Sequence, residues 1–263
     1  MGTSLTRPPL VEAILELKWQ LENTPQGILV DKSFEVAHIR LANEVAGEFP
    51  FVEPLPSVQI PSQISSYITK YRYRTGSEEW PLIQLGPGIA TLNFTKPYDW
   101  KKFLETSEKL VGWLHKAYSD HPLTLVSSQL RYINAEPFDF QKNDVLEFIQ
   151  RYLHTEIRPP KGITDSTLIK GHSQSVSWSF EYPLSALESS GIVRFSTGTM
   201  SNGDSEDKKV VIWELLAQAT GNHAPLFSTE GENNLLSWID EAHEVIEKWF
   251  FTFIAGELFE RYK

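Results

Sequence analysis

"PLVEAILELKW", residues 9–19, aligns without a gap with "PLTLVSSQLRY", residues 122–132. Each stretch begins with proline and leucine, and each ends with a leucine, a basic residue and an aromatic residue in the same register. The pattern of both predicts a β-strand. Because a recurrence at a fixed spacing indicates an internal repeat, we expect two copies of one unit with a boundary near residue 121.

The order of the other expected elements repeats as well. Periodicity predicts, for the first half, a strand near 9–20, a helix near 33–47, strands near 66–74 and 82–95, and a helix near 99–119. For the second half it predicts a strand near 123–136, a helix near 143–154, strands near 167–181, 191–199 and 208–217, and a helix near 234–259. Each half therefore reads strand, helix, two or three strands, helix.

The two closing helices also align. Their corresponding residues are Trp100 and Leu236, Phe103 and Ile239, Leu110 and Ile246, and Trp113 and Trp249. We therefore predict an α+β fold built from an internally duplicated strand-helix-strand-strand-helix module, with a mainly antiparallel sheet packed against long helices. Residues 1–121 form the first repeat and residues 122–263 the second, packed together as one compact unit about a pseudo-twofold axis.

Three other stretches are read as turns or loops. In "IQLGPGIATLNF", residues 83–94, Gly86 and Gly88 lack the third glycine or the Gly-Lys-Ser/Thr ending of a phosphate loop, so we expect a bend or bulge within or between strands. The four prolines of "FPFVEPLPSVQIPSQ", residues 49–63, forbid a regular helix. "GTMSNGDSEDKK", residues 198–209, has the composition of an exposed hairpin tip.

Composition narrows the class of protein. The 263 residues include no cysteine, which excludes disulfides and thiolate metal sites and is typical of the cytoplasm. The N-terminal stretch has no signal-peptide pattern, and "WFFTFIAGELF", residues 249–259, is too short to span a bilayer. We expect a soluble cytoplasmic protein that is not bound to a membrane.

Charge bears on nucleic acid as a partner. The net charge of −10, from 24 basic and 34 acidic residues, opposes general binding to a polyanion, so nucleic acid needs a local basic patch. The best candidate is "SYITKYRYR", where strand alternation places Lys70, Arg72 and Arg74 on one face and Tyr71 and Tyr73 on the other. The same pattern also describes an ordinary strand with a buried tyrosine face and a solvated basic face.

No catalytic signature is complete. In "IDEAHEVIEKW", residues 239–249, Asp240, His243 and Glu247 share a helix face, but the second histidine of an H-E-x-x-H zinc motif is missing. His243 also lies on the apolar stripe of its helix, so we expect it to be packed and hydrogen-bonded beneath the other half. "GHSQS", residues 171–175, lacks the second glycine of a nucleophile elbow. We expect no catalytic residue, no metal and no cofactor.

Aromatic residues suggest a surface for a protein partner. The eight tryptophans exceed what a core of this size needs. "YITKYRYRTGSEEWPLIQL", residues 67–85, combines tyrosine, arginine and tryptophan beside a turn, and these residue types are enriched at binding hot spots. We therefore predict partner binding at Tyr71, Arg72, Arg74 and Trp80.

Four stretches carry a resemblance to a family: "PPLVEAILELKW" (8–19), "YDWKKF" (98–103), "LRYIN" (130–134) and "LLSWIDEAHEVIEKWFFTFIAGELF" (235–259). Together they resemble a sporadically distributed family of uncharacterised bacterial and archaeal proteins of about this length. Proteins that look like these can occur beside antiviral defence genes of the CRISPR type, which implies an accessory subunit that binds another protein. The resemblance supplies no catalytic residue.

The sequence thus favours a non-enzymatic, protein-binding accessory or scaffold subunit of a prokaryotic defence or regulatory complex. An enzyme or a small-ligand or metal-binding protein with a pocket between the halves is the alternative, with Asp240, His243 and Glu247 as its candidates. Nucleic-acid binding through the basic strand is a further alternative. The sequence leaves the oligomeric state open.

Overall fold

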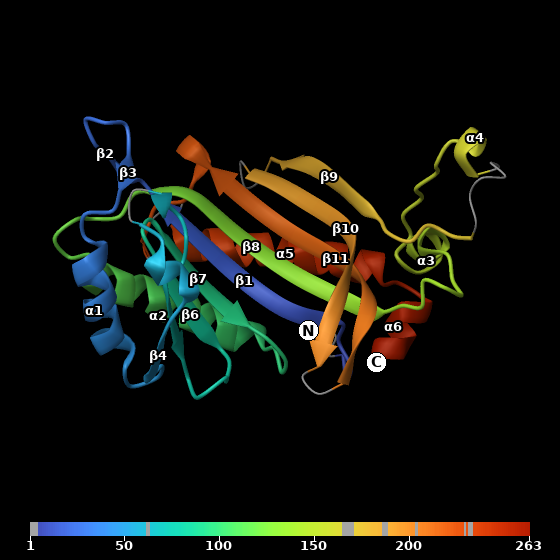
Figure 1. Cartoon of the computed structure of the whole chain (residues 1–263), viewed down its shortest axis with the longest axis horizontal. Helices are drawn as coiled ribbons and strands as arrows, with labels where there is room; N and C mark the ends of the chain where they lie inside the picture. Colours follow the sequence, from blue (N-terminus) through green and yellow to red (C-terminus); the bar gives the residue numbers. More distant parts are fainter. Residues whose placement is uncertain are drawn as a thin grey trace.

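The computed structural model describes residues 5–61, 64–164, 171–185, 189–202, 205–228, 230 and 234–263. Within these residues one nine-stranded sheet has the order β4-β5-β6-β7-β1-β8-β11-β10-β9, and each neighbouring pair is antiparallel (Figure 1). The protein is therefore a mixed α and β structure with a large antiparallel sheet and six α-helices in its described part.

The first half contains β1 (Leu10–Trp19), β2 (Glu22–Asn23), β3 (Leu29–Val30), α1 (Phe34–Val45), β4 (Phe51–Pro54), β5 (Tyr71–Arg74), β6 (Leu82–Gly86), β7 (Ile89–Phe94) and α2 (Trp100–Ala117). The second half contains β8 (Leu125–Pro137), α3 (Val145–Tyr152), α4 (Lys161–Thr164), β9 (Ser177–Leu184), β10 (Ser189–Asn202), β11 (Ser205–Thr220), α5 (Leu235–Phe253) and α6 (Glu257–Tyr262). The connection from α2 to β8 contains the predicted boundary at residue 121.

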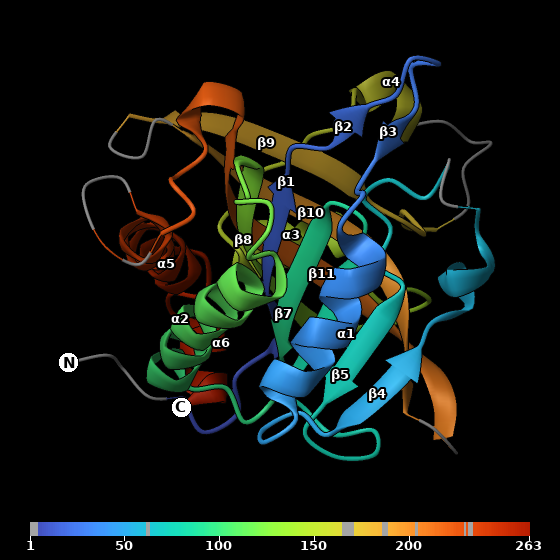
Figure 2. The same ribbon diagram turned by 90° about the vertical axis from the view of Figure 1, so that its left-hand side faces the viewer.

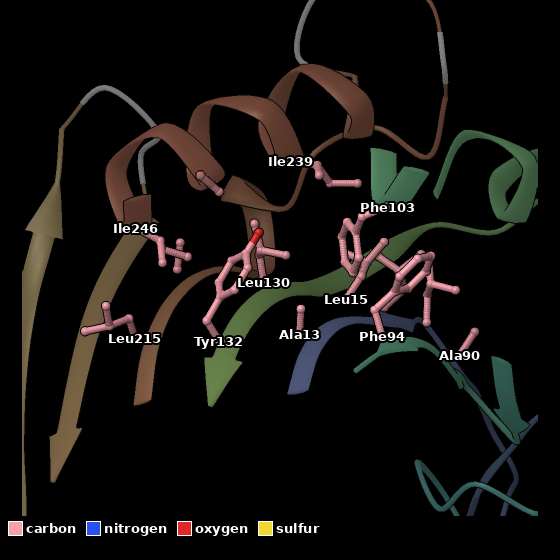
Figure 3. Close-up of a cluster of buried hydrophobic side chains, with 14 of the residues drawn as sticks. Ala13, Leu15, Ala90, Phe94, Phe103, Leu130, Tyr132, Leu215, Ile239 and Ile246 are labelled. Carbon is pink, nitrogen blue, oxygen red and sulfur yellow. The ribbon is translucent and has the colours of Figure 1, made fainter. Parts of the chain in front are cut away.

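The two aligned stretches lie largely in the two central strands. β1 and β8 pair directly, with Leu15 opposite Leu130 and Glu16 opposite Gln129. Alternation sends leucines to the helix side and polar residues such as Glu16 to the other side of the sheet. Figure 3 shows Leu15 and Leu130 on the side that α5 covers, below Ile239. The buried core lies between this side of the sheet and the helices.

Helices α2 and α5 cover that side of the sheet, one over each half (Figures 1 and 2). Each begins at a capped residue: the Asp99 carboxylate accepts a hydrogen bond from the Lys102 amide at 2.8 Å, and the Asn234 side chain accepts one from the Ser237 amide at 2.9 Å. Their inward residues are fully buried and fix both helices on the sheet.

The strand order is symmetric about the β1–β8 pair apart from β4, which adds one more strand outside β5 in the first half. Outward from β1 come β7, β6 and β5 of the first half, and outward from β8 come β11, β10 and β9 of the second. The sequence alignment fits this order: its aligned pairs Leu17 with Leu130 and Trp19 with Tyr132 all join the core on the helix side. The aligned pairs of the closing helices also share their burial, since Phe103 and Ile239 are buried and Trp113 and Trp249 are half-buried.

Gly86 and Gly88 lie at the turn between β6 and β7, so the bend between strands is confirmed and the single predicted strand near 82–95 is two. A side chain at Gly86 would come within 2.0 Å of the Ile68 carbonyl oxygen, so the backbones are too close for any other residue. Gly88 has a φ of 77°, which favours glycine.

Three other elements differ from the sequence prediction. The predicted helix near 234–259 is two helices, because the chain turns at Gly256 with a φ of 84° between α5 and α6. The proline-rich stretch contains the short exposed edge strand β4, which periodicity missed. The strand predicted near 167–181 begins only at Ser177, and residues 165–170 lie outside the described part. In the described residues, no helix combines the length and apolar character needed to cross a membrane.

Candidate functional site

A pocket of about 370 Å³ opens between the start of α2, the middle of α5 and the strands β1 and β8. We call it the junction pocket, since it takes residues from both halves of the chain. Its lining residues are Leu5, Pro8, Leu10, Tyr98, Asp99, Trp100, Tyr132, Asn134, His243, Ile246, Glu247, Phe250 and Phe251.

A chain of hydrogen bonds crosses the polar part of the junction pocket. The hydroxyl oxygens of Tyr98 and Tyr132 are 2.7 Å apart, and the Tyr132 hydroxyl is 2.9 Å from Nδ1 of His243. The Tyr132 hydroxyl thus bonds to both neighbours, and Figure 3 shows it pointing from β8 toward α5. Trp100 stacks on the imidazole of His243, with ring centres 3.7 Å apart and planes at 12°. His243 of α5 therefore connects this helix with α2 and with the central strand β8.

Burial keeps these polar groups neutral. It lowers the pKa of His243 to about 4, although the nearby carboxylate of Asp240 acts in the opposite direction. Burial also raises the pKa of both Tyr98 and Tyr132 well above the usual value for a phenol. At neutral pH the imidazole and the two hydroxyls therefore act as hydrogen-bonding groups without charge.

The charged groups of the lining are carboxylates. Asp99 caps α2, and Glu247 lies one turn beyond His243 on α5. None of the described residues that line the pocket is lysine or arginine. The junction pocket thus combines aromatic walls, neutral hydrogen-bonding groups and acidic side chains.

Sequence reasoning found part of this site. His243 is packed and hydrogen-bonded as expected, and its ring rests on Trp100 of the other half. Glu247 lines the junction pocket with it and Asp240 lies outside the lining, and both side chains are exposed. In the described part of the chain, no group of three histidine, aspartate or glutamate side chains is placed to hold a metal ion.

Sequence reasoning missed Tyr98, Trp100 and Tyr132 as site residues. Tyr98 and Trp100 lie at the start of α2, in the stretch "YDW". Tyr132 is the last residue of the aligned stretch 122–132. Aromatic residues at the start of a helix and within a central strand were the available signal. Only the packing of α2 beside α5 brings them together.

The predicted partner surface is divided between the two faces of β5. Tyr71 packs beneath α1, where its ring stacks on His38 at 4.2 Å, and Arg72 and Arg74 point to the other face. Both guanidinium groups contact the carboxylate of Glu53, each at 3.2 Å. The hydrogen bond from Arg74 holds the pKa of Glu53 below its usual value.

Trp80 lies beside this pair of arginines. The Arg74 guanidinium is 5.9 Å from its ring centre, and Trp80 remains 38% exposed. The side chains of Arg72 and Arg74 are only 25% and 13% exposed. The strand alternation expected from sequence is present, but the arginines are already paired and largely covered.

A second pocket, of about 520 Å³, surrounds Asp31 near the end of α2. One carboxylate oxygen of Asp31 accepts hydrogen bonds from the Trp19 indole, the Tyr118 hydroxyl and the Gly88 amide, at 3.0 to 3.2 Å. The other accepts one from the Ser33 amide at 3.1 Å. These bonds tie the loop that contains Asp31 to the end of β1, to the turn between β6 and β7 and to the residue that follows α2. Asp31 therefore has a structural role, and the junction pocket is the better candidate site.

Comparisons of the chain with protein-family models, with curated proteins and with solved structures find no match.

Proposed function

We propose that the protein binds a small organic ligand in the junction pocket. The observation that carries the proposal is the set of groups centred on His243: the stacked Trp100, the two linked tyrosine hydroxyls and the surrounding apolar residues. A volume of about 370 Å³ falls within the range of roughly 300 to 1,000 Å³ that is usual for small-molecule sites. A few fixed polar groups within apolar walls are the usual composition of such sites.

We propose binding without chemistry at this site. The described lining residues include no serine, threonine, cysteine or lysine that could act as a nucleophile. His243 is a weak base, because its pKa is about 4 and its Nδ1 is engaged with Tyr132. These groups suit recognition of a ligand better than transfer of a proton.

Two tryptophans of α2 provide a matched test. Trp100 lines the junction pocket and Trp113 does not, although both are half-buried on the same helix. We expect small aromatic compounds to raise the melting temperature of the wild-type protein and to bind in calorimetry. Trp100→Leu should weaken binding at least tenfold, about 1.4 kcal/mol, because the stacked wall is lost, whereas Trp113→Leu should leave it unchanged.

Two results would contradict the proposal. One is a broad panel of small aromatic compounds from which none binds the wild-type protein. The other is a compound whose affinity is the same for wild type and Trp100→Leu, since its site would then lie elsewhere. An independent test is to purify the protein from its native source, denature it and identify any released small molecule by mass spectrometry.

We also propose that the junction pocket lies where two duplicated units meet, residues 1–121 and 122–263. The symmetric strand order and the shared burial of the aligned pairs support this duplication. A rigid superposition of β1 on β8 together with α2 on α5 tests it. The duplication is refuted if the strands and helices cannot be matched by one rotation.

A second candidate function, the protein-binding accessory subunit, is favoured by the outer strand of the second half. Trp178 and Tyr182 on β9 are 48% and 49% exposed, and large exposed aromatic residues are typical of binding hot spots. The family resemblance supports a cytoplasmic defence or regulatory complex as the setting of that partner. Nucleic acid is less favoured, because the best basic strand has its arginines paired with Glu53.

Co-purification from the native organism tests this second function and locates the surface. If β9 binds the partner, changing Trp178 and Tyr182 to serine should remove it from the purified material. If the predicted surface at β5 binds it, replacement of Arg72, Arg74 and Trp80 by alanine should do so. A partner that both variants retain would exclude both surfaces.

A further inference from the structure

We infer that the ligand of the junction pocket is an organic cation, a quaternary or protonated amine attached to an apolar group. This inference rests on the proposed function and specifies its ligand. Three features of the junction pocket carry it: the aromatic walls, the acidic side chains and the absence of basic side chains among the described lining residues.

The walls consist largely of aromatic rings. Tyr98 and Trp100 contribute from the first half, and Tyr132, Phe250 and Phe251 from the second. The faces of aromatic rings attract cations through their electron-rich π systems, and aromatic cages commonly hold quaternary ammonium groups. Neutral apolar ligands also fit such walls, so the choice between them depends on charge.

The charges of the lining favour a cation. Asp99 and Glu247 are its acidic residues; both are exposed, and no described residue forms a salt bridge with either of them. Burial is the main cause of the raised pKa of Tyr98 and Tyr132, and the negative charge of Glu247 adds to it. His243 is neutral at pH 7, because its pKa is about 4. A cationic ligand would supply the positive charge that the lining lacks.

The same charges disfavour an anion. A carboxylate or phosphate in the junction pocket would lie near two carboxylates without a basic side chain to pair with it. Burial of an unpaired charge is costly, so an anionic ligand would lose more solvation than it regains. The expected order of affinity is therefore cation, then neutral compound, then anion.

Three probes that share one ring test this order by calorimetry: benzyltrimethylammonium as the cation, benzyl alcohol as the neutral compound and phenylacetate as the anion. We expect benzyltrimethylammonium to bind at least tenfold more tightly than the other two. If benzyl alcohol or phenylacetate binds equally well or better, the inference is wrong, while a small-ligand function of the pocket stands. If none of the three binds, the inference fails, and the broad panel decides whether the proposed function fails with it.

A pair of variants on α5 then tests whether the carboxylate of Glu247 attracts the cationic ligand. Both carboxylates are exposed, but Glu247→Gln removes one that lines the pocket, and Glu244→Gln removes one of the same helix that lies outside the lining. Glu247→Gln should lower the affinity for benzyltrimethylammonium about tenfold and leave that for benzyl alcohol unchanged, and Glu244→Gln should change neither. Equal losses in both variants would show a general effect of net charge and would overturn the role of Glu247.

Discussion

The two halves of the molecule have similar central parts and different outer parts. In the first half, α1 packs beside α2 and covers β5, where Phe34 and Tyr71 lie near each other. In the second half, α3 lies at the far end of β8 and packs against α6, with Arg151 paired to Glu257 (Figure 1). A helix therefore covers β5 in the first half, whereas α3 does not cover the corresponding strand β9 in the second.

This difference determines which aromatic residues remain exposed. Tyr73 on β5 is fully buried, and its hydroxyl donates to the backbone carbonyl of His38 at 3.1 Å. On β9, Trp178 and Tyr182 face the same side of the sheet but are about half exposed, although Tyr182 contacts Trp249. The strand β5 is covered by α1, whereas β9 is left accessible, as is the outer strand β4 beside β5.

A second difference between the halves lies at one aligned position of α2 and α5. Ser107 of α2 corresponds to His243 of α5 in the alignment that matches Trp113 with Trp249. Ser107 is fully buried, and its hydroxyl donates to the Phe103 carbonyl within its own helix at 2.8 Å. His243 instead reaches Tyr132 and Trp100 in the junction pocket. Similar frameworks thus support a closed core on one side and a polar pocket on the other.

The largest expected effect tests whether the two halves form one cooperative unit. Phe103 and Ile239 are aligned, fully buried residues of α2 and α5. Phe103→Ala should lower the free energy of unfolding by about 3 to 5 kcal/mol and Ile239→Ala by about 2 to 5 kcal/mol, because each leaves a cavity. Chemical denaturation, followed by circular dichroism, should show a single transition in both variants, since the sheet is continuous across the halves. Two separated transitions would mean that the halves unfold independently.

The next effect concerns pH and the aligned pair Ser107 and His243. His243 has a folded pKa of about 4, below the unfolded value of about 6.5, so the unfolded chain binds the extra proton first. Its contribution to stability is complete above about pH 6.5, is lost as the pH falls toward 4, and changes no further below that. The loss should be about 2 to 3 kcal/mol. Unfolding measured between pH 4 and 7 checks it.

Two variants isolate this contribution from other groups that titrate in the same range. His243→Gln should remove the corresponding slope from the pH profile, whereas Ser107→Ala should leave the slope as in wild type because serine does not titrate there. If wild type and His243→Gln have parallel profiles, His243 is not held neutral by its surroundings. Ser107 and His243 would then not differ in how they make stability depend on pH.

The smallest effect tests the contrast between β5 and β9. Changing Tyr182 to serine on β9 should cost less than about 1 kcal/mol, because much of the side chain is already in water. Tyr71→Ser on β5 should cost about 2 kcal/mol, because the ring stacks on His38 beneath α1. Thermal unfolding of both variants gives the comparison. Equal losses would mean that β9 is covered in solution, for example by another molecule.

The sequence by itself predicted the mixed α and β class, the antiparallel sheet and the place of most elements. It could do so because strand and helix patterns are local. Proline and glycine marked most of the interruptions, including the turn at Gly88, but not the end of α5 at Gly256. Apolar residues continue past Gly256, so periodicity alone joined the two helices.

Only the tertiary structure decided the candidate site and the different exposure of the aromatic residues on β5 and β9. Tyr98, Tyr132 and His243 are 34 and 111 residues apart, and no local pattern relates residues at such separations. Their meeting depends on how α2 and α5 lie over the central strands. The positions of α1 and α3 likewise depend on which surface each helix packs against, because an amphipathic pattern specifies that a helix is covered on one side but not by what.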